Sequence, residues 1–567
     1  MNVKKDDVFD IVIEDMTKDG EGIGKLQGFP FFVKDAVIGD KVKVKVMKVK
    51  KGYAYARLER IIKPGKDRVS PRCPVARQCG GCTLQHLSYE KQLEYKYHKV
   101  ENCLKRIGKV ENIDSLMEPI IGMFTREEAE TLDNHLICAN VCDKGAWNYR
   151  NKAQFPVGRN KKGELVTGFY AGRSHVIIDQ PYCYLQTEGT ELICEQVKLF
   201  MEEYHIPPYD EEAHSGVLRH ILIRAGAVSG QVMVCLVINA PALPYAQEFG
   251  ERLSSLPGMT SISYNVNQEK TNRILGEKTV TVWGEDTITD SIGGVEFKIS
   301  PRSFYQVNPV QTRVLYEKAL EYAGLTGKET VWDIYCGIGT ISLFLARTAG
   351  HVHGVELVPE AIADAKENAK LNGFTNTSFY VGKAEEVLPR EFEEHQVKAD
   401  VIVVDPPRKG CDAKVLATMV KMKPERIVYV SCDPATLARD VKWLGEMGYE
   451  VKRVCPVDMF PQGGHVEGVV LLSQQKADDY IEVELELDEL DLTSAESKAT
   501  YKEIQEYVLK EHGLKVSNLY ISQVKRKCGI EVGENYNLPK SEESRQPQCP
   551  EEKEKAIKDA LEHFGMI

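Results

Sequence analysis

The sequence lacks any hydrophobic stretch suited to entering or crossing a membrane. Its opening residues, MNVKKDDVFD, contain no apolar core of a signal peptide. No uninterrupted apolar run reaches the roughly 18 residues of a membrane-spanning helix. We therefore expect a cytoplasmic protein with no membrane partner.

The sequence also lacks the overall positive charge that is typical of nucleic-acid-binding proteins, since its formal net charge is -11. Much of this charge lies in residues 476–567, which hold 21 Asp and Glu against 13 Lys and Arg, a balance of -8. Residues 41–68 are instead strongly basic, with interleaved tyrosines. This composition suits a phosphate backbone and stacked bases. The alternative interpretation is a solvated strand face, because Lys alternating with Val is also typical of an exposed sheet.

A chain of 567 residues is too long for one hydrophobic core, so several domains are expected. Short apolar and polar steps in the first segment predict a small barrel of about five strands. A mixed α+β domain follows, and then strands alternate with helices as in a doubly wound parallel α/β sheet. The last segment predicts helices at about 497–512 and 517–528. The predicted domains are 1–63, 64–299 with an insertion at 124–146, 300–475, and an acidic extension at 476–567.

The stretch DIYCGIGTISLFLA, residues 333–346, predicts a strand, a glycine loop and a helix that begins at about Thr340. Gly337 and Gly339 let a ligand approach the backbone, and Glu356 ends the next strand where an acid meets ribose hydroxyls. The spacing differs from the Gly-x-Gly-x-x-Gly of dinucleotide sites. It therefore favours a nucleoside without a phosphate, such as S-adenosylmethionine.

The stretch VIVVDPPRKG places Asp405 at the end of a third strand, beside the expected cofactor. Enzymes that methylate exocyclic amines resemble this stretch but have an aromatic residue after the prolines, to stack on the base. This chain has Arg408 at that position. The difference favours carbon as the methyl acceptor.

The stretch VSCDPATLARD places Cys432 at the carboxyl end of a fourth strand, the position at which open α/β sheets bind ligands. C5 of uracil is a poor nucleophile, so an enzyme first adds a thiolate at C6 and later needs a base to remove the C5 proton. Glu467, which precedes the apolar run GVVLL, is the candidate base. The alternatives are a small buried cysteine and a surface carboxylate at a strand start.

Three cysteines lie within ten residues, in the spacing Cys73-x5-Cys79-x2-Cys82, and flank Gly80-Gly81. A cytoplasmic protein is not expected to hold them in disulfides, so metal ligation is the better interpretation. With the distant Cys183 they make four soft thiolates, which suit either zinc or an iron-sulfur cluster. Spacing alone slightly favours zinc. Scattered core cysteines are the remaining alternative.

From Ile13 to about Leu472 the chain resembles the RNA 5-methyluridine methyltransferases, the family that includes RumA and TrmA, and especially its ribosomal RNA branch. The resemblance implies that the N-terminal barrel is a TRAM domain, an OB-like RNA-binding module, and that the α/β region is a Rossmann-like class I methyltransferase domain. It implies that Cys432 is the nucleophile and Glu467 the base. It implies a 4Fe-4S cluster on Cys73, Cys79, Cys82 and Cys183. The implied S-adenosylmethionine-binding residues are Gln306, Tyr335, Glu356 and Asp405, with Thr340 as a weaker correspondence.

The expected function is transfer of a methyl group from S-adenosylmethionine to C5 of a uridine in 23S ribosomal RNA, by a monomer. The four cysteines and the TRAM-like barrel favour ribosomal over transfer RNA. Three alternatives stay open at this point: a transfer-RNA uracil-C5 methyltransferase, an RNA cytosine-C5 methyltransferase, and a non-catalytic iron-sulfur RNA-binding protein.

Overall fold

The structure is a computed structural model that describes residues 3–17, 19–172, 174–180, 182–475, 501–514, 516–528 and 549–564. The chain divides into two compact units, Met1–Lys476 and Ala477–Ile567. Within the described residues, no helix is both long and apolar enough to cross a bilayer.

The first unit begins with a closed five-stranded barrel in the order β1-β2-β3-β5-β4, which confirms the predicted barrel. Val42, Val44 and Val46 point into its core and are fully buried, while the lysines between them face outward. This alternation is the period-two pattern of a strand with one apolar face. The strands are β1 (Val8–Met16), β2 (Gly22–Leu26), β3 (Phe29–Val33), β4 (Lys41–Val49) and β5 (Ala54–Lys63).

A mixed seven-stranded sheet forms the middle of this unit, in the order β10-β9-β8-β11-β12-β13-β14. Apolar side chains of α4 (Thr190–Glu203) and α5 (Ala246–Ser254) pack against it and share one hydrophobic core with its strands. The strands are β8 (Lys152–Arg159), β9 (Leu165–Tyr170), β10 (Ile177–Asp179), β11 (Leu218–Ala225), β12 (Val232–Ile238), β13 (Met259–Val266) and β14 (Lys278–Gly284).

The third part is a nine-stranded sheet in the order β19-β18-β17-β20-β21-β23-β22-β6-β7. Its first five strands run parallel and are the predicted doubly wound α/β region, whereas β23 is antiparallel to both neighbours. The strands are β6 (Ile120–Phe124), β7 (Ile137–Val141), β17 (Thr330–Ile334), β18 (His351–Glu356), β19 (Thr377–Val381), β20 (Val401–Val404), β21 (Arg426–Ser431), β22 (Tyr449–Val457) and β23 (Glu467–Gln474).

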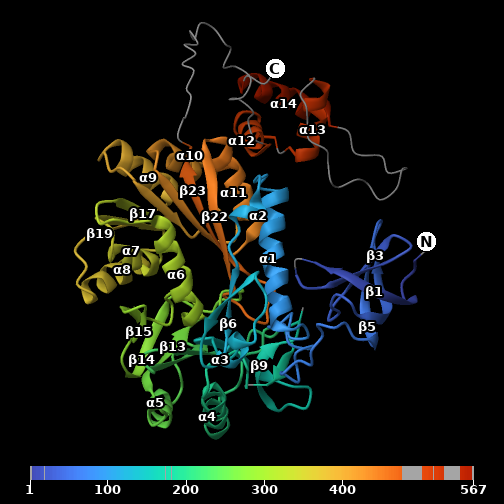
Figure 1. The fold of residues 1–567 in the computed structure, drawn as a ribbon, viewed down its shortest axis with the longest axis vertical. Helices are drawn as coiled ribbons and strands as arrows, with labels where there is room; N and C mark the ends of the chain where they lie inside the picture. The colour runs from blue at the N-terminus through green and yellow to red at the C-terminus, as the bar shows by residue number, and fades with distance from the viewer. Residues whose placement is uncertain are drawn as a thin grey trace. The chain divides into compact units, whose positions relative to one another are not determined.

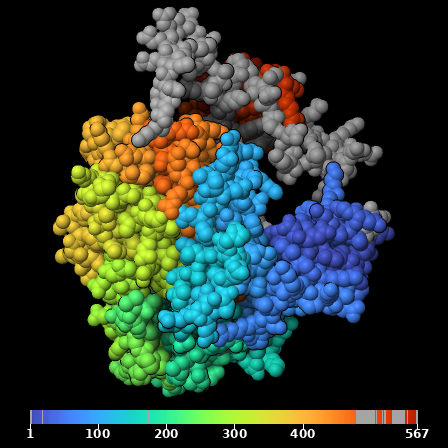
Figure 2. All heavy atoms as spheres, viewed as in Figure 1, coloured from blue at the N-terminus to red at the C-terminus, as the bar shows by residue number. Residues whose placement is uncertain are grey.

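Helices cover this sheet, and a two-stranded hairpin of β15 (Ile288–Ile292) and β16 (Val295–Ile299) packs beside them. Long α1 packs against α11, so residues about 330 positions apart lie side by side; Figure 2 shows them as neighbouring light blue and orange atoms. The helices are α1 (Tyr89–Arg106), α2 (Ile113–Leu116), α3 (Arg126–Glu130), α6 (Pro309–Ala323), α7 (Thr340–Ala346), α8 (Pro359–Leu371), α9 (Ala384–Glu393), α10 (Ala413–Met422) and α11 (Pro434–Glu446).

The segment 124–146, interpreted from sequence as an insertion in the middle domain, belongs instead to the nine-stranded sheet. β6 and β7 pair in parallel with each other, and β6 pairs with β22, so both strands extend the edge of that sheet (Figure 1). Ile120, Phe124 and Ile137 are buried in the same core as residues of α1 and α11. Burial of these side chains at the edge of the nine-stranded sheet explains why the segment packs there and not in the middle domain.

The second unit contains α12 (Tyr501–His512), α13 (Asn518–Lys527) and α14 (Glu551–His563), which share a small apolar core. The first two helices agree with the predicted helical stretches. The acidity predicted for this extension lies almost entirely in residues 476–500, with nine Asp and Glu against two Lys and Arg, and these lie outside the described residues. Residues 501–567 hold 12 acidic and 11 basic residues.

Candidate functional site

The loop after β17 has the open backbone that the sequence predicts. Tyr335 has φ 71°, Gly337 φ 55° and Gly339 φ 83°, all in the left-handed region. A Cβ added at Gly337 would meet no atom within 4 Å, so the space above this residue is open to a ligand. The Gly337 amide donates to the Glu356 carboxylate at 3.3 Å, which joins the loop to the end of β18.

A cavity of about 750 Å³ lies at the carboxyl ends of the parallel strands. Open α/β sheets bind ligands in this position, because the loops that connect strands to helices diverge there. The cavity brings together all six residues that sequence reasoning selected for the cofactor and the chemistry. They are Gln306, Tyr335, Glu356, Asp405, Cys432 and Glu467, and Thr340 also lines the wall.

Cys432 is held between β21 and α11. Asp433 caps the helix, accepting hydrogen bonds from the backbone amides of Ala435 at 2.9 Å and Thr436 at 3.1 Å, and Pro434 takes the first helical position. The strand end and the cap fix the backbone on both sides of Cys432. Its half-buried side chain faces the cavity.

Glu467 reaches the same place from the antiparallel strand. β23 begins at Glu467 and runs against β21, so that Gly468 lies opposite Ser431. The start of β23 therefore meets the end of β21, which brings Glu467 next to Cys432. The Glu467 side chain is buried, with 4% of its surface exposed.

The cavity concentrates negative charge in a buried setting. Burial raises the pKa of Asp333 to about 7, and burial together with the nearby Asp405 holds the pKa of Glu467 well above its usual value. Burial also raises the pKa of the Cys432 thiol to about 11, helped by Glu467 and Asp405 and opposed by the Arg408 guanidinium. A cation bound here would stabilise the charged forms of these groups.

The raised pKa of the buried Asp333 carboxyl can be tested in the ligand-free protein. Its side chain is fully buried; one carboxylate oxygen accepts from the Ser342 hydroxyl and the other has no partner. Because the folded pKa is about 7 against an ordinary 3.8, the folded state binds more protons between these pH values. Its contribution to stability is therefore lost as pH rises from about 4 to 7.

We expect Asp333→Asn to stabilise the ligand-free protein at pH 8 by a few kcal/mol relative to wild type, since one pKa unit corresponds to about 1.4 kcal/mol. Urea unfolding at pH 5 and pH 8 measures the difference. Asp143→Asn, at an exposed position, is the control and should leave the pH dependence unchanged. If the free energy of unfolding changed equally between pH 5 and pH 8 in wild type and Asp333→Asn, the result would contradict a buried, unpaired charge at Asp333.

The loop 458–466, which leads into Glu467, is anchored by residues that sequence reasoning missed. Lys96 of α1 donates to Asp458 at 2.6 Å, and both side chains are fully buried. Gln92, also on α1, accepts from the Gln462 amide and donates to the Gln462 side chain, each at 3.0 Å. The only sequence signal was a lysine on the apolar face of a helix, and its partner lies 362 residues away.

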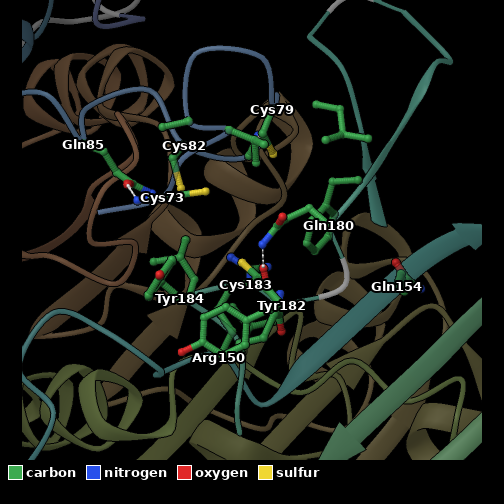
Figure 3. Close-up of a pocket in the computed structure, with 18 of the residues that line it drawn as sticks. Cys73, Cys79, Cys82, Gln85, Arg150, Gln154, Gln180, Tyr182, Cys183 and Tyr184 are labelled. Atoms are coloured by element: carbon green, nitrogen blue, oxygen red, sulfur yellow. Dashed lines mark hydrogen bonds between the residues drawn. The ribbon is translucent and has the colours of Figure 1, made fainter. Parts of the chain in front are cut away.

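A second cavity, of about 370 Å³, is lined by Cys73, Cys79, Cys82 and Cys183. We call residues 73–84, which hold the first three of these cysteines, the cysteine connector. In Figure 3 its cysteines face Cys183 across one space. All four are free thiols. Burial, with a smaller contribution from the neighbouring cysteines, raises the pKa of Cys82 to about 12. Within the described ranges, no three His, Cys, Asp or Glu side chains converge closely enough to hold a single metal ion.

The two cavities are neighbours. Val307 lines the cysteine cavity and Gln306 lines the larger one. The amides of Thr83 and Leu84, which directly follow Cys82, donate to the carbonyl of Gln462 at 3.1 and 3.0 Å. The cysteine connector therefore contacts the loop that positions Glu467.

A doubly wound sheet with a glycine loop, an acid at the end of the next strand and an acidic cavity at its carboxyl edge is the arrangement of a class of nucleoside-binding α/β enzymes, to which S-adenosylmethionine-dependent methyltransferases belong. Comparison with known proteins identifies the family. The family model for tRNA (uracil-5-)-methyltransferase matches residues 285–475, and the TRAM domain model matches residues 3–58.

Curated relatives extend this match over most of the chain. An uncharacterized RNA methyltransferase of Halalkalibacterium halodurans is 51% identical over 471 residues, which is 83% of this chain and 98% of the relative. One from Clostridium acetobutylicum is 47% identical over 473 residues, with the same coverage. The chain belongs to the RNA uracil-5 methyltransferases, and S-adenosylmethionine is its methyl donor.

A solved structure agrees with this assignment. The Pyrococcus abyssi tRNA (uracil-54, C5)-methyltransferase, in complex with S-adenosyl-L-homocysteine, has a TM-score of 0.63 and 29% identity. The match covers 82% of this chain and 100% of that chain. It supports both the fold and the use of S-adenosylmethionine.

Proposed function

We propose that this enzyme methylates C5 of a uridine in 23S ribosomal RNA through a covalent adduct between Cys432 and C6 of the base. The observation that carries the proposal is the meeting of Cys432 and Glu467 in one cavity with the predicted cofactor residues. A nucleophile and a base next to a methyl donor are what C5 methylation of a pyrimidine needs.

The proposed reaction has three steps on the base. The Cys432 thiolate adds to C6, which makes C5 a carbon nucleophile. C5 then forms a bond to the methyl carbon as the bond from that carbon to the sulfonium sulfur breaks, and the electron pair of the broken bond stays on the sulfur. Glu467 then takes the proton that C5 still carries. The electron pair of that C–H bond restores the C5–C6 double bond, and the Cys432 sulfur leaves C6 with its electrons.

Gln306, Tyr335, Glu356 and Asp405 are the proposed S-adenosylmethionine-binding residues. The open loop at Gly337 and the raised pKa of the buried acids fit a donor that carries a positive sulfonium. When bound, that donor supplies an electrophilic methyl group. Glu356 is the proposed partner of the ribose hydroxyl pair, and its position at the end of β18 beside the glycine loop supports this role.

The target base must be unpaired or flipped out of its helix to reach the cavity. The barrel and the four cysteines support ribosomal RNA as the substrate, because both belong to the resemblance to the ribosomal branch of the family. The Pyrococcus enzyme, whose substrate is a tRNA, makes transfer RNA the second candidate. Mass-spectrometric mapping of 5-methyluridine in both RNAs, with and without the gene, distinguishes them. Loss of the modified base from 23S RNA supports the proposal, and loss only from tRNA contradicts it.

We further propose that Cys73, Cys79, Cys82 and Cys183 hold a 4Fe-4S cluster. Four thiols around one cavity supply the ligand set of such a cluster. The cavity encloses about 370 Å³, and within the described residues no three of the thiols converge on a point that one ion could occupy, which favours a multi-iron cluster over zinc. Arg150 and Lys152 line the same cavity and would balance the charge of the thiolates.

Anaerobically purified protein is expected to be brown and to contain iron and acid-labile sulfide. Cys82→Ser should lower both contents severalfold, because it removes one of four ligands. Cys142→Ser is the matched control, since Cys142 packs near Cys82 but does not line the cavity. A colourless wild-type protein with one bound zinc would contradict the assignment.

A further inference from the structure

The outer surface of the barrel carries three aromatic rings that its core does not use. Phe32 of β3 and Tyr55 of β5 face each other across the strand pair, and Tyr53 precedes β5. Their ring centroids lie 5.2 to 5.7 Å apart. All three side chains are half-buried, and none belongs to the hydrophobic core of the barrel.

The alternation along the strands explains why these rings face outward. In β5, Ala54 and Ala56 are buried on either side of Tyr55. In β3, Phe31 and Val33 are buried on either side of Phe32. Period-two alternation therefore puts both rings on the solvent face, where an aromatic residue gains little for folding.

Two groups of lysines on and after β4 differ in their ion pairs. Lys43 and Lys45, in the middle of β4, form ion pairs with Asp10 and Asp6 at 2.7 and 3.1 Å. These carboxylates neutralise two lysines of the basic stretch that the sequence suggested for RNA binding. An alternating Lys-Val strand is thus, in part, the solvated face of a sheet.

The second group, Lys48, Lys50 and Lys51, lies at the end of β4 and in the turn to β5, next to the aromatic rings. Lys48 is opposite Tyr55 in the strand register, and the Lys50 amide donates to the Tyr53 carbonyl at 2.8 Å. All three lysines are exposed and form no ion pair with any residue that the structure describes. Among the described residues, no carboxylate therefore pairs with the positive charge beside the three rings.

We propose that Phe32, Tyr53 and Tyr55, with Lys48, Lys50 and Lys51, form a stacking platform for unpaired bases of the RNA substrate. Rings accept the faces of bases of any type, and the lysines contact the phosphates between them. The platform adds a contact outside the methylation cavity. It deepens the proposed function, and rests on it only for the identity of the RNA.

The test uses the full-length protein and a single-stranded RNA of mixed sequence, about 16 nucleotides long, enough for one OB-fold site. We expect Phe32→Leu and Tyr53→Leu each to weaken binding about tenfold. Their thermal unfolding midpoints should stay near wild type, because the rings lie outside the core. Unchanged RNA affinity in the double variant Phe32→Leu/Tyr53→Leu would overturn the platform, even if this surface binds some other molecule.

The salt dependence of binding separates the two groups of lysines. Each of Lys48→Gln, Lys50→Gln and Lys51→Gln should reduce the slope of log K against log salt by about 0.7, the value for one phosphate contact on single-stranded RNA. Lys43→Gln and Lys45→Gln are matched controls on the same strand and should change the slope little. Equal effects of the two groups would overturn the assignment of the phosphate contacts.

Methyl transfer is measured separately on the same variants. Weakened RNA binding without detectable uridine methylation by wild type would refute the proposed function and leave the platform standing. Normal methylation by wild type, with full RNA affinity in the double variant, would refute the platform alone.

Discussion

Replacement of Cys432 by alanine is expected to abolish methyl transfer, with kcat reduced by about 10⁴-fold or more, as for other enzymes that lose a catalytic nucleophile. Without the sulfur, C5 of the base does not become nucleophilic enough to accept a methyl group. Incorporation of labelled methyl groups from S-adenosylmethionine into ribosomal RNA measures the effect. The substitution is expected to leave the fold intact, since Cys432 is half-buried in the cavity wall and alanine is smaller.

Cys103→Ala is the matched control for this experiment. Cys103 is likewise half-buried, but it lies on α1 and does not line the cavity. We expect its activity to stay within a few-fold of wild type. Equal methyl incorporation by Cys432→Ala and Cys103→Ala would remove the covalent mechanism.

Replacement of Glu467 by glutamine is expected to trap the enzyme on its RNA. The amide cannot accept the C5 proton, so Cys432 cannot leave C6 after the methyl group has been transferred. Turnover should fall by about 10² to 10⁴-fold, the usual range for a general base. A protein-RNA adduct that survives a denaturing gel, and whose RNA carries the methyl group, is the expected product.

The double variant Cys432→Ala/Glu467→Gln separates this adduct from nonspecific crosslinking. It keeps the amide at position 467 but offers no sulfur to the base, so it should form no adduct. Glu467→Gln with normal turnover, or an adduct in the double variant, would show that Glu467 is not the base for a cysteine-bound intermediate.

The sequence predicted where each candidate residue lies along its own strand. Glu356, Asp405 and Cys432 all stand at the ends of apolar runs, and parallel strands end at one edge of a sheet, so their meeting was predictable. The approach of Glu467 depends on β23 running antiparallel to β21. No local pattern in the run GVVLL specifies that direction.

Contacts between distant segments account for what the sequence did not predict. The segment 124–146 joins the nine-stranded sheet because β6 pairs with β22, a strand more than 300 residues later. Lys96 and Asp458 form a buried pair across a similar separation. The barrel lysines show the same limit, since the neutralising Asp10 lies on β1 and Asp6 lies just before that strand. Strand order and pairing, which decide these contacts, follow from packing of the whole chain.

The most direct test of the account is a trap with RNA in which 5-fluorouridine replaces uridine. Fluorine at C5 leaves no proton for Glu467 to remove, so the methylated base should stay bonded to the enzyme. Digestion and mass spectrometry are predicted to locate the methylated, fluorinated nucleotide on the peptide that contains Cys432. A stable adduct on any other residue, or normal methyl transfer with no adduct, would contradict the central claim.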